Sequence, residues 1–162
     1  MTRNIATLFG IGLIAMAPGT WGSLAALPLA YLLHFLGSFP LLAAATLIVF
    51  LVGYWAAAVE TRGQENHDPS EIVIDEVVGQ WLALFPISAG LWLTKADPAS
   101  FPWPGWVASF LAFRFFDIVK PWPVSWADAK ETPLGLMLDD VLAGVMAALV
   151  VLAIGFVVQS VT

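Results

Sequence analysis

The charged residues of this chain are confined to a few short clusters, and this distribution restricts the possible folds more than any other feature. The 162 residues include 6 Lys or Arg and 12 Asp or Glu. None of these occurs in residues 4–59, 77–94, 98–113 or 141–162. A helix needs about 20 apolar residues to cross the roughly 30 Å hydrocarbon core of a bilayer. Because several uncharged stretches approach or exceed this length, the sequence predicts an all-α membrane protein with several spans.

The composition supports this prediction and excludes other classes of protein. Apolar residues make up 60% of the chain and charged residues 11%, against about 45–50% and about 25% in an average soluble domain. A soluble domain of this size could not hide so much apolar surface from water. The net charge of −6 argues against nucleic-acid binding, and the lack of Cys excludes disulfides and thiolate chemistry. We therefore expect a single membrane-embedded domain covering residues 1–162.

The uncharged stretches predict a polytopic helical bundle of about five spans. A tight turn is expected at residues 37–40, between the first two spans. Residues 5–17 are apolar but too short to cross a bilayer, and we expect a short interfacial or re-entrant helix there rather than a signal peptide. Asp68 and Pro69 are typical of the start of a helix that leads into the third span. The five expected spans are residues 22–36, 41–59, 77–94, 106–119 and 136–158.

The positions of Lys and Arg predict the orientation of these spans. If the N-terminus is cytoplasmic and the spans alternate in direction, five basic residues lie on the cytoplasmic side and only Lys95 lies on the other, in agreement with the positive-inside rule. The same alternation brings four unusual segments to the cytoplasmic mouth of the bundle, and we expect the functional site there. These segments are residues 18–23, 75–79, 114–123 and 139–144.

Acidic pairs open two of the expected spans. Asp75 and Glu76 stand at the start of one, and Asp139 and Asp140 at the start of another. Acidic residues near or within spans are costly and by default suggest a functional site. Together with Asp117, five carboxylates are expected at one depth, where they must bind cations or take up protons. Oxygen ligands without Cys favour Mg²⁺, Mn²⁺ or Ca²⁺. The alternative is that the first pair is only a polar helix entrance, favoured by the helix dipole.

Charged residues mark the end of the fourth expected span, residues 106–119. Arg114, Asp117 and Lys120 are spaced i, i+3 and i+6, so that neighbours are within reach of one another. An Arg fork and a Lys point charge beside carboxylates suit a phosphate group. The alternative is an Arg114–Asp117 ion pair that lets both charges enter the membrane. Thr20 and Ser23, near a helix start whose N–H groups attract anions, are weaker candidates for phosphate contact, with a simple Gly/Pro turn as the alternative.

Four segments of the sequence resemble the phosphatidylglycerophosphatase A family of bacterial inner-membrane enzymes. They read PGTWGSLAALP, DPSEIVIDEVVGQWLAL, FRFFDIVKPWPVSWAD and GLMLDDVLAG, and they occur in the family's order between Pro18 and Gly144. The resemblance implies Mg²⁺-dependent hydrolysis of the terminal phosphate of the phospholipid phosphatidylglycerophosphate, which gives phosphatidylglycerol. It extends to motif residues throughout these segments, namely Gly19, Thr20, Gly22, Ser23, Asp75, Glu76, Gly79, Arg114, Asp117, Lys120, Pro121, Asp139, Asp140 and Gly144.

These observations lead to a hypothesis with a role for each group of residues. Asp117 would complete or orient the metal shell, and both an activated water and a carboxylate are left open as the nucleophile. The rival function is a cation or proton-coupled transporter that uses the same carboxylates, although transporter sites usually lie near the membrane midplane. The expected ligands of one or two Mg²⁺ ions are Asp75, Glu76, Asp139 and Asp140. The expected phosphate contacts are Arg114, Lys120, Thr20 and Ser23.

Overall fold

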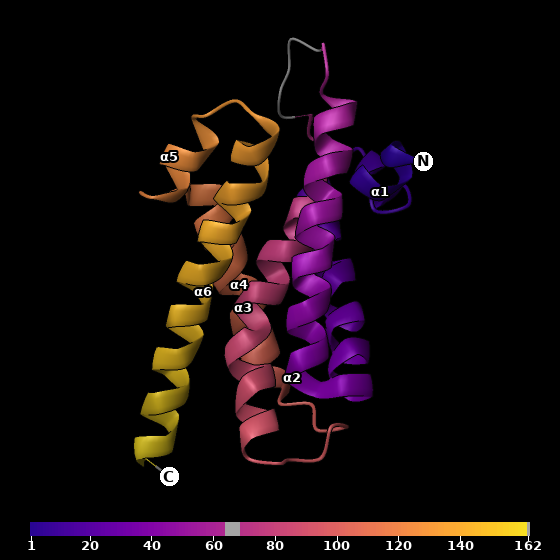
Figure 1. Cartoon of the computed structure of the whole chain (residues 1–162). Helices are drawn as coiled ribbons and strands as arrows, with labels where there is room; N and C mark the ends of the chain where they lie inside the picture. The colour runs from indigo at the N-terminus through magenta and orange to yellow at the C-terminus, as the bar shows by residue number, and fades with distance from the viewer. Residues whose placement is uncertain (64–68, 162) are drawn as a thin grey trace.

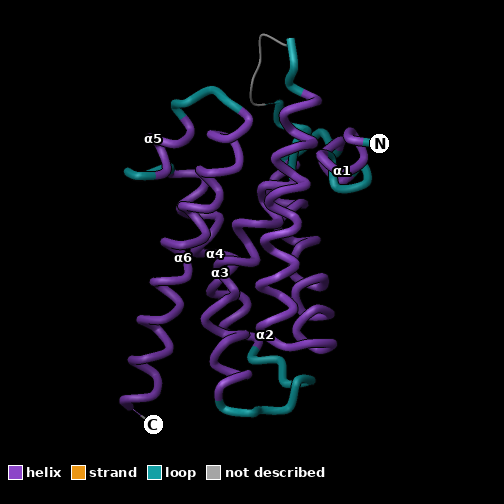
Figure 2. Tube along the Cα trace, in the orientation of Figure 1, coloured by secondary structure: helices purple, strands orange, loops and turns teal. Residues whose placement is uncertain are grey.

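A computed structural model of the chain describes residues 1–63 and 69–161, and all regular structure within these residues is helical (Figure 1). The predicted all-α class is therefore confirmed for the described part of the chain. Figure 2 shows that the loops gather at the ends of the long helices. The elements are α1 (Thr2–Ala6), the 3₁₀ helix η1 (Ile11–Leu13), α2 (Pro18–Glu60), α3 (Ile74–Leu93), α4 (Trp103–Val119), α5 (Val124–Asp128) and α6 (Pro133–Val161).

The long helices run roughly along one axis, so the molecule has two distinct ends (Figure 1). At the upper end in that view lie α1, α5 and the starts of α3 and α6. At the opposite end lie the bend of α2, the connection from α3 to α4 and the C-terminus. The upper end, which carries the candidate site described below, is called the site end.

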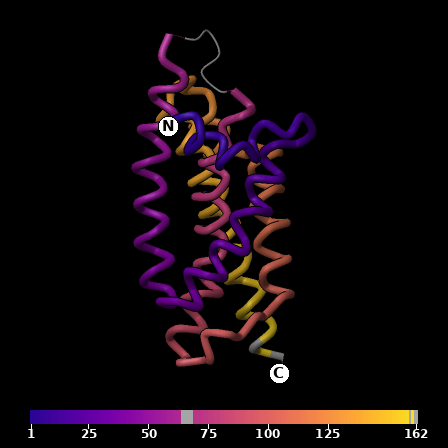
Figure 3. The backbone as a smooth tube through the Cα atoms, turned by 90° about the vertical axis from the view of Figure 1, so that its right-hand side faces the viewer, coloured from indigo at the N-terminus to yellow at the C-terminus, as the bar shows by residue number. Residues whose placement is uncertain are grey.

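α2 turns back on itself near its middle. Gly37 (φ −154°, ψ 18°) and Ser38 (φ 55°, ψ −157°) leave helical geometry, and Pro40 follows them directly. The helix therefore consists of two arms, which meet at the bend and both lead back toward the site end (Figure 3). The turn predicted at residues 37–40 is confirmed by this bend.

Three helices in the described residues are long and apolar enough to cross a membrane, fewer than the five spans expected from the sequence. They are Pro18–Glu60, Ile74–Leu93 and Pro133–Val158. The difference has two causes. The first two expected spans form the arms of the single bent helix α2. The span expected at residues 106–119 falls in α4, which has only 17 residues and carries Arg114 and Asp117 near its end.

The N-terminal segment is not the single helix expected over residues 5–17. Leu8, Phe9 and Gly10 have φ values of 47°, 55° and 96°, and such left-handed backbone cannot continue a right-handed helix. The segment is instead the short helix α1 followed by the η1 turn. α1 packs against α2, and Thr2 Oγ1 donates a hydrogen bond of 2.5 Å to Glu60 Oε1.

α3 begins later than the sequence predicted. The expected N-cap, Asp68, lies outside the described residues. Residues 69–73 are not helical, with a turn at Ser70 and Glu71, and the helix starts at Ile74. The backbone N–H of Val73 donates a hydrogen bond of 2.9 Å to the carbonyl oxygen of Ala6. This contact with the N-terminal segment holds the chain outside the helix at Val73. As a result, Asp75 and Glu76 lie in the first turn of α3.

α3 is the central helix of the bundle, because it packs against α2, α4 and α6 and is buried throughout residues 74–81. Its packing depends on two glycines. A Cβ atom on Gly144 would collide with the carbonyl oxygen of Gly79, and a Cβ atom on Gly79 would collide with the ring of Phe113. Small residues allow membrane helices to approach closely in this way. The space beside Gly79 is therefore filled by neighbouring helices.

Candidate active site

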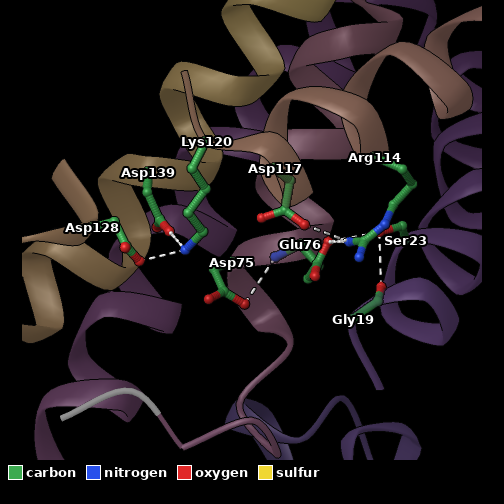
Figure 4. A network of polar contacts seen from close by, with 9 residues as sticks. All are labelled: Gly19, Ser23, Asp75, Glu76, Arg114, Asp117, Lys120, Asp128 and Asp139. Carbon is green, nitrogen blue, oxygen red and sulfur yellow. Dashed lines mark hydrogen bonds and ion pairs between the residues drawn. The ribbon is translucent and has the colours of Figure 1, made fainter. Parts of the chain in front are cut away.

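The site end of the bundle brings charged side chains of α3, α4 and α6 together with the uncharged first turn of α2 (Figure 4). α3 contributes the acidic pair of its first turn, and α4 contributes two charged residues from its last two turns. A second acidic pair lies two turns into α6, and the first turn of α2 approaches from the side. The four segments singled out in the sequence therefore meet at one end of the molecule.

Arg114 connects α4 to α3 and α2. Its Nη1 atom lies 2.5 Å from Glu76 Oε2 and 3.0 Å from Asp117 Oδ2, and donates to Ser23 Oγ at 3.2 Å. The Ser23 hydroxyl also lies 2.7 Å from Glu76 Oε2. The side chains of Arg114, Glu76 and Asp117 are only 14%, 10% and 13% exposed. The predicted Arg114–Asp117 pair is thus present, but a second carboxylate and a hydroxyl share the same guanidinium.

The Arg114 guanidinium keeps donors that these contacts do not use. Its described polar contacts all involve Nη1, while Nε is buried and has no hydrogen-bond partner among the described residues. Nε and Nη2 lie on one edge of the planar group, and such a two-donor edge binds carboxylate or phosphate oxygens in bidentate fashion. Arg114 therefore holds Glu76 and Asp117 through Nη1, and its buried Nε is a donor without a partner among the described residues.

Glu76, Asp117 and Asp140 form a group of three carboxylates. One oxygen of each lies within 4.8 Å of the others. The Asp140 residue is only 3% exposed and, unlike the other two, belongs to none of the ion pairs found in the described residues. Carboxylates this close repel one another unless a cation or a proton lies between them. A donor set of carboxylate oxygens fits a hard divalent cation such as Mg²⁺ or Ca²⁺.

Lys120 forms a second cluster beside this group. It ends α4 in the left-handed conformation (φ 47°, ψ 53°), and its Nζ atom pairs with Asp128 and with Asp139 Oδ2, the latter at 2.8 Å. Burial alone would lower the pKa of the Lys120 ammonium, but the two carboxylates outweigh this effect and raise that pKa above its usual range. In this cluster, called the Lys120 cluster (Lys120, Asp128 and Asp139), the Lys120 ammonium therefore keeps its positive charge between two carboxylates.

The structure brings together only part of the metal-ligand set expected from the sequence. Glu76 and Asp140 lie in the three-carboxylate group, whereas Asp75 and Asp139 lie outside it. Asp75 Oδ1 accepts a hydrogen bond of 2.9 Å from the backbone N–H of Glu76, and Asp139 belongs to the Lys120 cluster. Asp117, expected only to complete or orient the shell, takes a full place in the group.

The first turn of α2 reaches the site through its small residues. A Cβ atom on Gly19 would collide with Glu76 Oε1 and would lie 3.3 Å from Arg114 Nη1. Ser23 joins the same network, as described above. Thr20 lies in the same turn and is half-buried, but among the described residues no polar contact joins its side chain to this network. The small residues of the Gly-Thr-Trp-Gly-Ser motif therefore allow the first turn of α2 to pack closely against α3.

Asp128 is a site residue that sequence reasoning missed. It lies in α5, a single helical turn outside the expected spans, and its carboxylate pairs with Lys120 across eight positions of the chain. The available signal was its place in the segment FRFFDIVKPWPVSWAD, whose closely spaced prolines turn the chain back after α4. The sequence spacing alone could not indicate which basic residue it meets.

An apolar helical bundle with three buried carboxylates, an arginine and a lysine at one end defines a membrane-associated protein with a site suited to a phosphate group and a divalent cation. Comparison with known proteins identifies the family. The profile described as phosphatidylglycerophosphatase A matches residues 4–155. The chain therefore belongs to the phosphatidylglycerophosphatase A family, as its motifs implied, and is a phosphatase.

Individual relatives agree with this assignment. A phosphatidylglycerophosphatase A of Haemophilus influenzae is 40% identical over 153 residues, covering 94% of this chain and 87% of that protein. A phosphatidylglycerophosphatase A of Escherichia coli is 35% identical over 153 residues, covering 93% and 81%. A Bacteroides thetaiotaomicron protein, provisionally named a phosphatidylinositol-3-phosphatase, is 39% identical over 146 residues, covering 87% and 85%. No solved structure gives a significant match to the chain.

Proposed function

We propose that this chain hydrolyses the terminal phosphate monoester of phosphatidylglycerophosphate to give phosphatidylglycerol and phosphate, with Mg²⁺ as its cofactor. The observation that carries this proposal is the meeting of the Glu76, Asp117 and Asp140 carboxylates with Arg114 at one end of an apolar bundle. A phosphate monoester carries up to two negative charges near neutral pH, so its binding requires the cations that such a site can supply. The names of two relatives support the choice of lipid.

The metal ligands in this proposal are Glu76, Asp117 and Asp140. Asp75 and Asp139 flank them and add to the negative potential at Asp140. This proposal keeps Glu76 and Asp140 from the set expected from the sequence, adds Asp117 as a ligand, and places Asp75 and Asp139 around the ion rather than on it. A bound Mg²⁺ neutralises charge on the phosphate and lowers the pKa of a bound water.

The remaining polar groups act on the phosphate itself. The free edge of Arg114 binds two phosphate oxygens, and its charge stabilises the negative charge that develops in the transition state. Lys120, held by the carboxylates of its cluster, supplies a second positive charge. Ser23 orients Arg114 and Glu76, while Thr20 and the first N–H groups of α2 are secondary phosphate contacts. Attack by water and attack by a carboxylate both fit this arrangement; the second would leave an acyl phosphate that can be trapped.

We further propose that the chain crosses the bacterial inner membrane five times, through the two arms of α2 and through α3, α4 and α6, with the site at the cytoplasmic interface. The exposed Trp21, Trp122 and Trp126 belong to the site end, and the exposed Trp92 and Trp103 to the opposite end, as expected for residues at membrane interfaces. Basic residues are concentrated at the site end, which favours a cytoplasmic location. They are Arg3, Arg62, Arg114, Lys120 and Lys130, against Lys95 at the opposite end.

Phosphate release by the purified full chain in mixed micelles tests this function. Three substrates are compared in the presence of Mg²⁺: phosphatidylglycerophosphate, phosphatidylinositol 3-phosphate and water-soluble glycerol 3-phosphate. We expect turnover of the first to exceed that of the others. Preference for the inositol lipid would assign the chain to the activity in the name of the Bacteroides relative, and equal turnover of the soluble ester would contradict an interfacial site.

The transporter alternative is tested separately in sealed vesicles. Its site would have to pass a cation, but Arg114 and Lys120 stand beside the carboxylates and would repel one. We expect no cation flux through vesicles that contain the chain under conditions where it releases phosphate. Flux without phosphate release would replace the proposed function.

A further inference from the structure

An apolar cavity of about 650 Å³ lies between the first arm of α2 and α4. Leu24, Leu27 and Tyr31 line it from α2, and Val107 and Phe110 line it from α4. Its volume falls within the range of about 300–1,000 Å³ that is typical of small-molecule sites. The site network described above uses none of these side chains. We refer to this cavity as the α2–α4 groove.

The α2–α4 groove begins where the candidate active site ends. Leu24 directly follows Ser23 in α2, and Phe110 lies one helical turn before Arg114 in α4. Because Arg114 Nη1 and Ser23 Oγ are 3.2 Å apart, the two helices are held together at that end of the groove. The two helices can be followed in Figure 3 on the same side of the bundle. A ligand whose phosphate binds Arg114 therefore has the groove within reach of its tail.

The length of the groove suits an extended hydrocarbon chain. At 1.5 Å per residue, α2 rises about 12 Å from Ser23 to Tyr31, and α4 spans about 16 Å between Arg114 and Trp103. Aromatic rings line the end of the groove that lies farthest from Arg114. The ring of Phe101 lies 5.6 Å from that of Tyr31, measured between centroids, and 5.1 Å from that of Trp106.

The apolar side chains that line the groove favour a ligand without polar groups. A peptide in an apolar groove would leave its backbone N–H and C=O groups without partners, which is costly, whereas an acyl chain has no polar groups. Any membrane lipid could enter such a groove, but only a lipid with a terminal phosphate would also be held at Arg114. We infer that the α2–α4 groove binds one acyl chain of the lipid substrate, an inference that rests on the proposed lipid phosphatase function.

The groove would contribute to catalysis mainly by orienting the lipid substrate, and only slightly through the free energy of burying its acyl chain. Lipid tails are as apolar as the lining side chains, so moving a chain from the bilayer into the groove releases little free energy. A chain fixed there would limit the positions of the head group and hold the phosphate near Arg114. Correct orientation of reactants contributes strongly to rate. Filling the groove should therefore reduce kcat/KM for a long-chain substrate but spare a short-chain one.

Two variants fill the groove and two matched variants leave it open. Val107→Trp and Leu24→Trp place an indole in the groove, where both native side chains are part of the lining. Leu111→Trp on α4 and Leu29→Trp on α2 are the controls, since these residues are 60% and 41% exposed and do not line the groove. Each full-length protein is assayed in mixed micelles with phosphatidylglycerophosphate that carries either two palmitoyl or two hexanoyl chains.

We expect both filling variants to lose about tenfold in kcat/KM on the palmitoyl substrate, equivalent to about 1.4 kcal/mol, with little change on the hexanoyl substrate. The controls should match the wild type on both. Unchanged palmitoyl kinetics in both filling variants would overturn the assignment, as would an equal loss on both substrates. Failure of the proposed function would look different, because the wild type would then release no phosphate from either lipid.

A photoreactive lipid supplies a second readout that does not depend on turnover. Phosphatidylglycerophosphate with a diazirine in one acyl chain is irradiated with the wild-type protein in EDTA, and the labelled residues are identified by mass spectrometry. We expect labels within residues 24–31 and 101–110, reduced by excess unlabelled substrate and by Val107→Trp. Labels spread over all exposed apolar helix faces would indicate bulk lipid only and would overturn the inference.

Discussion

The Nη1 atom of Arg114 lies 2.5 Å from Oε2 of Glu76, so the end of α4 is tied to the first turn of the central helix α3. Asp117 shares the same nitrogen at 3.0 Å. Removing one partner of a buried ion pair leaves an uncompensated charge and is strongly destabilising. The pair therefore fixes the position of Glu76 in the bundle, and the proposed phosphate-binding role belongs to the Nε–Nη2 edge, which the described contacts leave unused.

Arg114→Lys separates these two roles. The ammonium keeps a positive charge beside Glu76, but a point charge cannot replace the planar fork. We predict that the melting temperature changes little, while kcat on phosphatidylglycerophosphate falls by about 10²–10³, corresponding to about 2.7–4 kcal/mol of transition-state stabilisation. The double variant Arg114→Leu/Asp117→Leu should be inactive. An active double variant would reduce Arg114 to a structural ion-pair partner.

Asp139 and Asp140 are adjacent in α6, but Asp139→Asn and Asp140→Asn should have different effects on stability and activity. Asp140→Asn removes a carboxylate that has no ion-pair partner among the described residues, so repulsion within the three-carboxylate group falls. We predict a higher melting temperature in EDTA and a loss of activity well beyond about 100-fold. Asp139→Asn leaves Lys120 paired with Asp128. We predict that this variant loses about 10–100-fold in activity, as is typical when a residue that contacts metal ligands from outside is changed.

Phosphate-release rates at saturating Mg²⁺ and melting curves in EDTA check both variants. Near-normal turnover by Asp140→Asn would remove that residue from the proposed metal ligands. An equal loss in the two variants would favour the four-carboxylate set expected from the sequence.

Gly144→Ala should disturb the contact between α6 and α3. The added methyl group would meet the carbonyl oxygen of Gly79, which belongs to the backbone and cannot turn aside. We predict a destabilisation of about 1–3 kcal/mol, typical of overpacking. Gly155→Ala is the matched control on the same helix, because a Cβ atom there meets nothing within 4 Å. Unfolding in detergent measures both, and equal stabilities would refute the close helix contact.

Gly19→Ala should act on the site. The added methyl group would displace the Glu76 carboxylate from Arg114, and a displacement of about 1 Å can cost about 100-fold in rate. We predict a loss of that order with little change in melting temperature. Gly90→Ala, whose Cβ atom meets nothing within 4 Å, should retain normal kinetics. If both variants were equally active, the first turn of α2 would have no part in the site.

The sequence predicted the features that depend on local chemistry. The uncharged stretches indicated the helices, and the Gly-Ser-Phe-Pro turn indicated the bend of α2. The charged motifs indicated which segments meet at the site end. The start of α3 was predicted too early, because the hydrogen bond from Val73 to Ala6 joins segments far apart in the chain. Likewise, the place of Asp117 beside Glu76 and Asp140 depends on how three helices pack, which the spacing within each helix does not contain.

Phosphate release from phosphatidylglycerophosphate by the purified wild-type chain, measured in EDTA and again after Mg²⁺ is restored, tests the proposed metal–carboxylate phosphatase most simply. The proposal requires that a divalent cation joins the Glu76, Asp117 and Asp140 carboxylates before the phosphate is attacked. We predict no release in EDTA and full recovery when Mg²⁺ is added in excess. Undiminished release in EDTA, or no release from this lipid at any Mg²⁺ concentration, would contradict it.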